Sequence, residues 1–228
     1  MANGATGWMC PAPGVDVTRI LIPQSQHTPG QVSYGAPRLR FGMHLDEELR
    51  AVVGKPMRSG PSVAPDPVNQ AMIRHWAAAF DDRNPVYTDP AAATASRFGG
   101  IIAPPLMLQT WTMPTPMLDG IRERGGAPQE SDGSGPLAAL DRAGYTGTLA
   151  TNSEYEILRP LRLGDVISSS TVIESISEPK RTRMGDSRFV TWLTTYTDDT
   201  GEIVGRQRFR IVKFVPPGIT VSTIEAGE

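Results

Sequence analysis

The sequence predicts an α+β domain in which helical segments come first and antiparallel strands follow. Two helix-start signals lie in the first half of the chain, where Asp66-Pro67 and Asp89-Pro90 each place an acidic N-cap residue before a proline. From Thr148 onward the chain is rich in β-branched and aromatic residues, which favour strands. Helices followed by a block of strands are typical of the α+β class.

Composition narrows the class of protein. The 228 residues are 39% hydrophobic and carry a net charge of −2, as expected for one globular domain with a substantial core. The near-neutral charge argues against nucleic acid as the main partner. The sequence contains neither an apolar run of about 18 residues nor a signal-peptide pattern, so we expect no membrane partner. One cysteine, Cys10, and three histidines predict a reducing cytoplasm and no metal site.

Three regions are expected along the chain. Residues 1–42 are rich in Gly, Pro, Ser and Gln and predict an irregular N-terminal extension, with one candidate strand at 19–22. Residues 43–217 form the single folded domain, and residues 218–228 form a C-terminal tail. A partner-binding arm is an alternative interpretation of the extension.

The helical half divides at Gly and Pro residues. We expect a helix over 46–53, an edge strand over 57–63, a helix over 66–80, a short helix over 89–96 and a central helix over 106–112. The 66–80 helix would bury one apolar stripe, because its apolar residues recur at helical spacing: Val68, Met72, Trp76, Ala79 and Phe80. Residues 113–147, which are rich in Gly, Pro and charge, predict a long loop.

The second half predicts four strands, over 148–158, 165–177, 188–197 and 202–215. Asp198-Asp199-Thr200-Gly201 supplies a hairpin turn between the last two. Val190, Trp192 and Tyr196 share one face of their strand, because side chains alternate with a period of two. We expect this face to contact the central helix.

A sequence motif in residues 80–113 carries the functional signal. The pattern DxNPxYxD over 82–89, followed by GGIIAPP over 99–105, resembles the N-terminal branch of the MaoC-type hydratase/dehydratase family. The resemblance covers roughly residues 46–215 and implies a hot-dog fold, an antiparallel sheet wrapped around a central helix that is shortened here. It also implies hydration of trans-2-enoyl-CoA thioesters, or the reverse dehydration, with coenzyme A as part of the substrate and no separate cofactor.

Two positions depart from the pattern of active members. Tyr87 stands where the family has its catalytic histidine, and a phenol with a pKa near ~10 stays protonated at neutral pH. Pro105 stands where the family has a glycine whose N–H donates to the thioester oxyanion, and proline has no N–H. Loss of one such donor typically lowers the rate by ~10²–10³-fold.

The resemblance therefore implies a degenerate subunit with no intact catalytic residue of its own. Asp82, Asn84, Tyr87 and Pro105 would be the remnants of the site, and a second MaoC-like hot-dog chain would supply Asp and His. An alternative is a protein that keeps only the fold, with DxNP as a turn and Pro105 as good helix-start chemistry.

The interruption after Met113 suggests the size of the substrate. Pro114 and Pro116 disfavour continuation of the central helix, and a shortened helix would leave the acyl tunnel open to a bulky acyl group. The stretch IIAPPLMLQTWTMP resembles the degenerate subunits of actinobacterial steroid side-chain hydratases in particular. The alternative is a long surface loop with no role in the pocket.

Several residues are candidates for binding the acyl-CoA substrate. Gln109, Thr110 and Trp111 lie on the predicted central helix, where Gln109 or Thr110 would contact the thioester and Trp111 would bind substrate or pack in the core. A second group would hold the nucleotide from a mobile loop between strands: Lys180, Arg181 and Arg183. A third group shares one face of the last strand and would contact CoA phosphates, or else form a solvated face or salt bridges to the partner subunit: Arg206, Arg208 and Arg210.

The sequence thus favours a subunit of a heteromeric enoyl-CoA hydratase that shapes the acyl and CoA pocket. Two other functions remain open at this stage. One is a non-catalytic acyl-CoA-binding or scaffold module, and the other is a subunit of a 3-hydroxyacyl-carrier-protein dehydratase.

Overall fold

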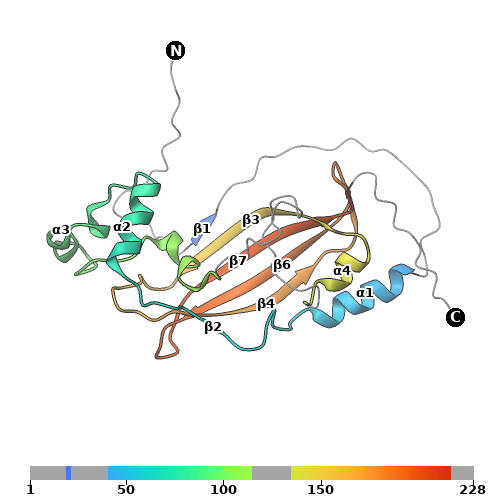
Figure 1. Cartoon of the computed structure of the whole chain (residues 1–228), viewed down its shortest axis with the longest axis horizontal. Coiled ribbons are helices and arrows are strands. Elements are labelled where there is room, and N and C mark those ends of the chain that lie inside the picture. The colour runs from blue at the N-terminus through green and yellow to red at the C-terminus, as the bar shows by residue number, and fades with distance from the viewer. Residues whose placement is uncertain (1–18, 22–40, 115–134, 217–228) are drawn as a thin grey trace, which may run out of the picture.

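A computed structural model describes residues 19–21, 41–114 and 135–216 of the chain. Within these ranges a single antiparallel sheet forms the frame of the molecule (Figure 1). Its strands are β1 (Arg19–Leu21), β2 (Ser62–Val63), β3 (Gly147–Ile157), β4 (Ser168–Ile176), β5 (Lys180–Thr182), β6 (Gly185–Thr197) and β7 (Ile203–Phe214).

The long strands match the sequence prediction closely. The sheet order is β1-β3-β7-β6-β4-β2, with β5 paired to β6 outside this path. The edge strand predicted over 57–63 is confirmed only at its last two residues, as β2, which pairs with β4. The predicted strand near residue 20 is confirmed as β1, at the other edge of the sheet. The predicted hairpin turn also forms, because Gly201 adopts φ 87° and donates its N–H to the Asp198 carbonyl at 3.1 Å.

The helices are short, and Figure 1 shows them at both ends of the sheet. Helices α2 and α3 lie at one end, and α1 and α4 lie at the other. The α-helices are α1 (Phe41–Val52), α2 (Gln70–Ala79), α3 (Pro90–Ala95) and α4 (Ala138–Arg142), and the 3-10 helices are η1 (Pro85–Tyr87), η2 (Pro105–Met107) and η3 (Thr110–Thr112). None of these helices is long and apolar enough to cross a lipid bilayer.

Helix α3 begins as predicted, with the Asp89 carboxylate accepting from the N–H groups of Ala91 and Ala92 at 2.8 and 3.1 Å. The expected start of α2 at Asp66 was wrong. The N–H of Val68 donates to the Asp165 carbonyl, and its own carbonyl accepts from Gly164, so this residue is paired with a turn and cannot join the helix. Asn69 caps α2 instead, accepting from Met72 N at 3.0 Å.

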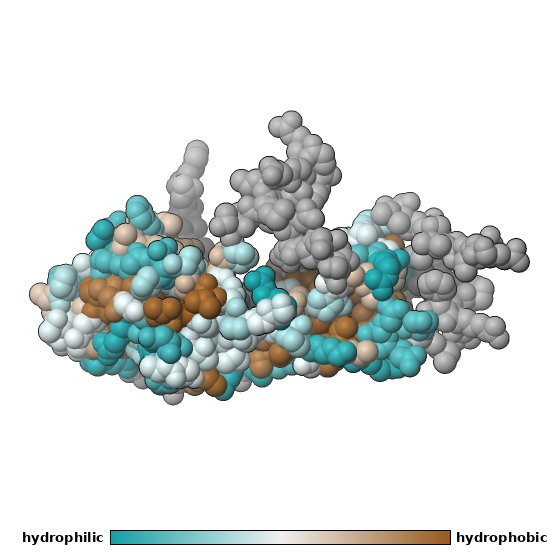
Figure 2. Space-filling view, turned by 60° about the horizontal axis from the view of Figure 1, so that its bottom comes forward, coloured by the Kyte–Doolittle hydropathy of each residue, from teal (hydrophilic) through white to brown (hydrophobic). Residues whose placement is uncertain are grey.

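The expected buried stripe of α2 was also wrong in part. Ile73 and Ala77 form its buried face, whereas Met72 and Phe80 are exposed, and Phe80 retains 61% of its surface. Trp76 packs partly on the core and stacks on Phe80, with ring centroids 4.4 Å apart. Hydrophobic surface is visible at the end of the molecule that carries α2 and α3 (Figure 2).

The central helix expected over 106–112 does not form. The segment folds into two 3-10 turns, η2 and η3, which are joined through Leu108 and Gln109. Pro104 and Pro105 precede it, and Met113 is extended at φ −67° and ψ 127°, as expected for a residue before proline. Only seven residues lie between the two proline-restricted ends, which is less than two full α-helical turns. We call residues 102–113 the central segment.

The loop expected over 113–147 is interrupted by α4, which the sequence analysis missed. Ala138 and Leu140 are its buried residues, and the run LAALDRAG contains good helix formers followed by a glycine stop. Residues 115–134, 1–18, 22–40 and 217–228 lie outside the described ranges, and with them most of the predicted extension and the C-terminal tail. Helix α1 begins at Phe41, earlier than the predicted residue 46.

The buried residues form two clusters along the sheet. The distal cluster lies under α1 and α4, and the central cluster lies under the central segment. Val190 belongs to the distal cluster, Trp192 packs against it, and only Tyr196 belongs to the central one, so the expectation that all three contact the central segment was wrong. The distal cluster contains Leu49, Leu140, Tyr145, Ile173, Val190 and Ile211. The central cluster contains Ala64, Val68, Ile73, Val86, Tyr87, Ala93, Ile102, Ala103, Met107, Leu108, Trp111, Tyr155, Leu161, Ile167, Tyr196 and Val204.

A glycine allows the central segment to approach the sheet closely. A Cβ atom on Gly205 of β7 would lie 2.8 Å from Leu108 Cδ2 and 2.8 Å from the carbonyl oxygen of Glu156. Contacts this short do not occur in relaxed structures, so Leu108 or the strand must shift if residue 205 carries a side chain.

We therefore expect Gly205→Ala to lower the free energy of unfolding by about 1–3 kcal/mol, because it overpacks this contact. Urea denaturation measures the change. Gly100→Ala is the matched control, because a Cβ there meets only Arg162 Nη1 at 4.0 Å, and its effect should stay within about 0.5 kcal/mol. Equal stabilities for Gly205→Ala and the wild type would show that Leu108 does not pack on this strand.

Candidate functional site

The DxNP motif forms a tight turn directly after α2. Asp81 adopts φ 49°, and the N–H of Asp82 donates to the Ala77 carbonyl at 2.8 Å. The Asp82 carboxylate accepts from Asn84 N at 3.1 Å. The Asn84 side-chain oxygen in turn accepts from Val86 N at 3.2 Å and caps η1. Both polar side chains of the motif therefore stabilise the turn by short-range bonds to the backbone.

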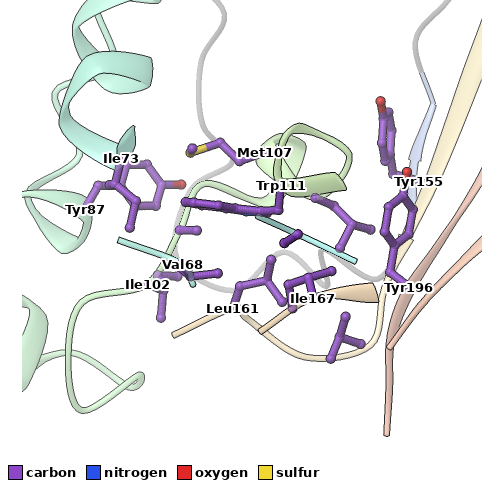
Figure 3. Close-up of a cluster of buried hydrophobic side chains, with 14 of the residues drawn as sticks. Val68, Ile73, Tyr87, Ile102, Met107, Trp111, Tyr155, Leu161, Ile167 and Tyr196 are labelled. Atoms are coloured by element: carbon purple, nitrogen blue, oxygen red, sulfur yellow. The ribbon is translucent and has the colours of Figure 1, made fainter. Parts of the chain in front are cut away.

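Tyr87 points into the protein core. Only 4% of its surface is exposed, and its carbonyl accepts from Gln70 Nε2 at 2.9 Å. Figure 3 shows its ring beside Ile73, with the hydroxyl directed toward Trp111. The residue at the family's histidine position is therefore a packed phenol on the central cluster, in a place where an imidazole would lose much of this contact.

The wall formed by Pro104 and Pro105 has few free amide donors. Neither proline has an N–H, and three nearby N–H groups are already used. Ala103 N donates to the Leu161 carbonyl at 2.9 Å, Met107 N to the Pro104 carbonyl at 2.9 Å, and Leu108 N to the Pro105 carbonyl at 3.2 Å. A thioester oxyanion placed here would find none of these amides available.

Gln109 is the centre of a buried hydrogen-bond network. Its side-chain oxygen accepts from the Tyr155 hydroxyl at 2.8 Å and from Gln207 Nε2 at 2.7 Å. Gln207 Nε2 also donates to Ser153 at 2.9 Å, and the Tyr196 hydroxyl donates to Gln207 Oε1 at 2.9 Å. The network ties the central segment to β3, β6 and β7 at once.

Burial keeps the two phenols of this network neutral. It raises the pKa of Tyr155, an effect that its hydrogen bond with Ser153 partly opposes. Burial also raises the pKa of Tyr196, with a further rise from Tyr155. Both hydroxyls therefore act as hydrogen-bond donors at neutral pH. The two side chains lie together beside the central segment in Figure 3.

The other two predicted substrate contacts on the central segment differ in exposure. Thr110 is half-buried at the start of η3, whereas Trp111 is 3% exposed and lies in the middle of the central cluster (Figure 3). The Trp111 Nε1 atom is buried and has no hydrogen-bond partner in the described part of the chain. Whether these residues contact substrate stays a prediction.

An apolar hollow lies on the outer side of the Pro104-Pro105 wall. We call this space, of about 180 Å³, the Pro105 hollow. It lies between the central segment and the chain that leaves β3. Its lining residues are Arg97, Phe98, Ile102, Ala103, Pro104, Pro105, Leu108, Ile157, Leu158, Arg159, Pro160 and Leu161.

One wall of the hollow is fixed by an ion-pair network around Arg159. Its guanidinium donates to Asp165 at 2.7 Å and to Asp198 at 2.6 Å. The Asp198 carboxylate also accepts from the Thr200 hydroxyl at 2.7 Å and from Glu202 N at 2.9 Å. These interactions, the Thr200 hydroxyl first and Arg159 second, hold the pKa of Asp198 well below its usual range. The β6–β7 hairpin is thereby tied to the turn after β3.

The predicted nucleotide-binding loop is not a loop. Lys180–Thr182 forms β5, which pairs with the start of β6, and Arg183 lies in the turn between them. Arg181 pairs with Asp186 at 2.8 Å, and the Lys180 ammonium lies 5.7 Å from the Phe189 ring centroid.

This hairpin and the Pro105 hollow lie at opposite ends of the sheet. The hairpin adjoins the first residues of β6, whereas Tyr196, near its last residues, belongs to the central cluster. Asp186 and Tyr196 are ten residues apart on this strand, which at roughly 3.3 Å per residue is about 30 Å. The structure therefore does not bring the basic group together with Tyr87 and Pro105.

The three arginines of β7 share one face, as predicted, and they have partners within the sheet. Arg206 pairs with Glu156 at 2.9 Å, Arg208 with Glu174 at 2.8 Å, and Arg210 Nε donates to Thr191 at 3.0 Å. These contacts lie within one chain, so they do not test the salt bridges to a partner subunit that the sequence analysis offered as an alternative. In the described ranges no group of three or more His, Cys, Asp or Glu residues is arranged to hold a metal ion.

A solved structure shares the arrangement of the sheet and the central segment. The chain superposes on a chain in the crystal structure of the ChsH1-ChsH2 complex from Mycobacterium tuberculosis with a TM-score of 0.64 and 37% identity. The match covers 78% of this chain and 99% of that chain. The predicted hot-dog architecture is therefore confirmed.

A family model described as "FAS1-like, dehydratase domain region" matches residues 51–207. The chain therefore belongs to the FAS1-like, MaoC-like dehydratase family, as the DxNP motif predicted.

Two curated relatives have names that state an activity. A probable enoyl-CoA hydratase alpha subunit from Thermomonospora curvata is 42% identical over 183 residues, which are 77% of this chain and 53% of that protein. The 3-oxo-4,17-pregnadiene-20-carboxyl-CoA hydratase alpha subunit of Mycobacterium tuberculosis is 39% identical over 175 residues, which are 75% of this chain and 53% of that protein. The chain spans about half the length of these relatives.

Replacing Gln109 tests the network. We expect Gln109→Leu to lower the free energy of unfolding by about 1–3 kcal/mol, because it leaves the buried Tyr155 hydroxyl without its acceptor. Thr110→Val is the matched control, since the Thr110 hydroxyl makes no hydrogen bond to the described residues, and its effect should stay within about 0.5 kcal/mol. Similar values for the two variants in thermal denaturation would contradict an anchoring role for Gln109.

The lowered pKa of Asp198 predicts an acid-sensitive hairpin. Because the folded-state pKa lies below the unfolded value of about 3.9, the carboxylate stabilises the fold above that pH, and the contribution is lost as the pH falls toward the folded-state pKa. Asp198→Asn should therefore be less stable than the wild type near pH 6 and lose less stability on acidification to about pH 3. Asp199→Asn, at the exposed neighbour, should follow the wild type. Identical pH profiles for Asp198→Asn and the wild type would refute this role.

Proposed function

We propose that this chain is the non-catalytic subunit of a heteromeric enoyl-CoA hydratase. The complex would add water to a trans-2-enoyl-CoA to give the 3-hydroxyacyl-CoA, or catalyse the reverse reaction. The names of the relatives and the similarity to a chain of the ChsH1-ChsH2 complex support an assembly of unlike subunits.

The absence of a usable acid–base pair at the DxNP turn is the observation that carries the proposal. Hydration needs a base to activate water and a donor to stabilise the enolate-like oxygen. Tyr87 is a buried phenol, and a phenol is a poor general base at neutral pH because its reference pKa is near ~10. Pro105 has no N–H to offer the oxygen. A second hot-dog chain carrying Asp and His would supply both functions.

In this assembly the present chain would contribute a wall of the substrate cleft. Asp82 and Asn84 would hold the turn that positions Tyr87, and the central segment would line the acyl side. Gln109 would act as a positioning residue through the network to β3 and β7. Coenzyme A would be part of the substrate and no separate cofactor would be needed.

The short central segment favours a bulky acyl group. Its last 3-10 turn ends at Thr112, whereas the sheet beneath it continues to the distal cluster under α1 and α4. A relative whose name specifies a pregnadiene carboxyl-CoA substrate supports a steroid or another polycyclic acyl group. Carrier-protein thioesters are the second candidate substrate class, and the test below separates the two.

Hydration by the chain alone and by a co-purified pair tests the proposal. We expect no turnover by the isolated chain, and rapid hydration once a hot-dog partner with intact Asp and His is co-expressed. Activity should be highest on polycyclic enoyl-CoA and low on carrier-protein thioesters. Tyr87→His should not restore activity to the isolated chain, because Pro105 still lacks the amide donor.

Three results would contradict the proposal in different ways. Hydration by the isolated chain at a normal enzymatic rate would mean that it has its own acid–base pair. Inactivity of the pair on every thioester would favour a scaffold or acyl-CoA-binding module. Preference for carrier-protein thioesters would favour a dehydratase of fatty-acid elongation.

A further inference from the structure

The Pro105 hollow is lined almost entirely by apolar side chains, and its walls contain few free backbone donors. Pro104, Pro105 and Pro160 have no N–H groups, and the N–H of Ala103 is bonded to the Leu161 carbonyl at 2.9 Å. The remaining lining is largely aliphatic, apart from the Phe98 ring and two arginines. An apolar surface of this kind favours an apolar ligand over a polar one.

The volume of the hollow limits the size of its ligand. An apolar cavity of about 150 Å³ is large enough to bind benzene. The Pro105 hollow, at about 180 Å³, therefore suits one ring or a short branched chain. Leu158 lies on its lining and is 46% exposed, so the hollow opens to solvent beside this residue.

The two arginines of the lining differ in their partners. The guanidinium of Arg159 is held by Asp165 and Asp198. Arg97 is exposed, and its guanidinium carbon lies 4.8 Å from the Phe98 ring centroid. Within the described ranges Arg97 has no carboxylate partner. The hollow therefore offers one cation that is available to a ligand.

We propose that the Pro105 hollow binds a small apolar carboxylate, with one ring or a short branched chain inside and the anionic head paired with Arg97. The charge at the rim distinguishes this ligand from a neutral apolar molecule of the same size. Binding is a property of this chain and does not depend on hydration activity. Of a larger acyl group, the hollow would hold only an end that is the size of one ring and carries a carboxylate.

Titration of the full chain, with labelled Ile and Leu methyl groups observed by NMR, tests the proposal. Cyclohexanecarboxylate should shift the methyl signals of Leu108, Ile157 and Leu161, with a dissociation constant in the millimolar range. Cyclohexylmethanol, which has the same ring and no charge, should bind at the same place about two- to fivefold more weakly, as expected for one exposed ion pair.

Three variants separate the contribution of the hollow's size to ligand binding from the contribution of charge. Leu158→Trp should weaken both ligands more than tenfold, because a larger side chain at an exposed lining position fills the space. Arg97→Gln should remove the preference for the acid and leave the alcohol unchanged. Arg162→Gln is the control, because Arg162 is exposed, has no ion pair in the described ranges and does not line the hollow.

The proposal is overturned if the acid shifts no methyl signal of the hollow, or if Arg97→Gln keeps the preference for the acid. It is also overturned if folded Leu158→Trp binds as the wild type does. Arg97→Gln alters only an exposed side chain, so this variant tests the proposed carboxylate site even if Leu158→Trp does not fold. These readouts use the isolated chain, so they are independent of the hydration assay of the pair.

Discussion

Three prolines and one glutamine decide how the centre of this protein is built. Pro104, Pro105 and Pro114 leave room for only two 3-10 turns, and Gln109 fixes those turns to three strands. The sheet beyond the central segment is covered by α1 and α4, which explains why the buried residues separate into two clusters. Pro104 and Pro105 have no N–H groups and form part of the apolar wall of the Pro105 hollow.

Short-range sequence patterns predicted most of the fold. The long strands, the Asp198–Gly201 turn and the Asp89 cap depend on residues close together in the chain, and all of them form. One error came from a contact that is distant in sequence. Val68 pairs with the turn at Asp165, which shortens α2. A second error was local, because residues 180–182 form a tight hairpin with residues 185–187 where a loop between strands was expected.

The candidate site could be predicted only in part for the same reason. Tyr87 and Pro105 are visible in the motif, because the family pattern makes their substitution obvious. Gln109 also lies in the motif region, but its partners Tyr155 and Gln207 come from strands 46 and 98 residues away. The Pro105 hollow joins residues 97–108 to residues 157–161, and no local pattern indicates that these two stretches face each other.

Under the proposed function, this chain would leave the chemistry to its partner and contribute one wall of the thioester cleft. The most direct measurement of this account is hydration by a co-purified pair in which only the partner's Asp and His are replaced, with this chain left as the wild type. The account predicts that such a pair assembles and is inactive, while Tyr87→Phe in this chain paired with an intact partner retains activity within about twofold. Hydration at a near-normal rate by the pair with the replaced partner residues would contradict it, because the acid and base would then belong to this chain.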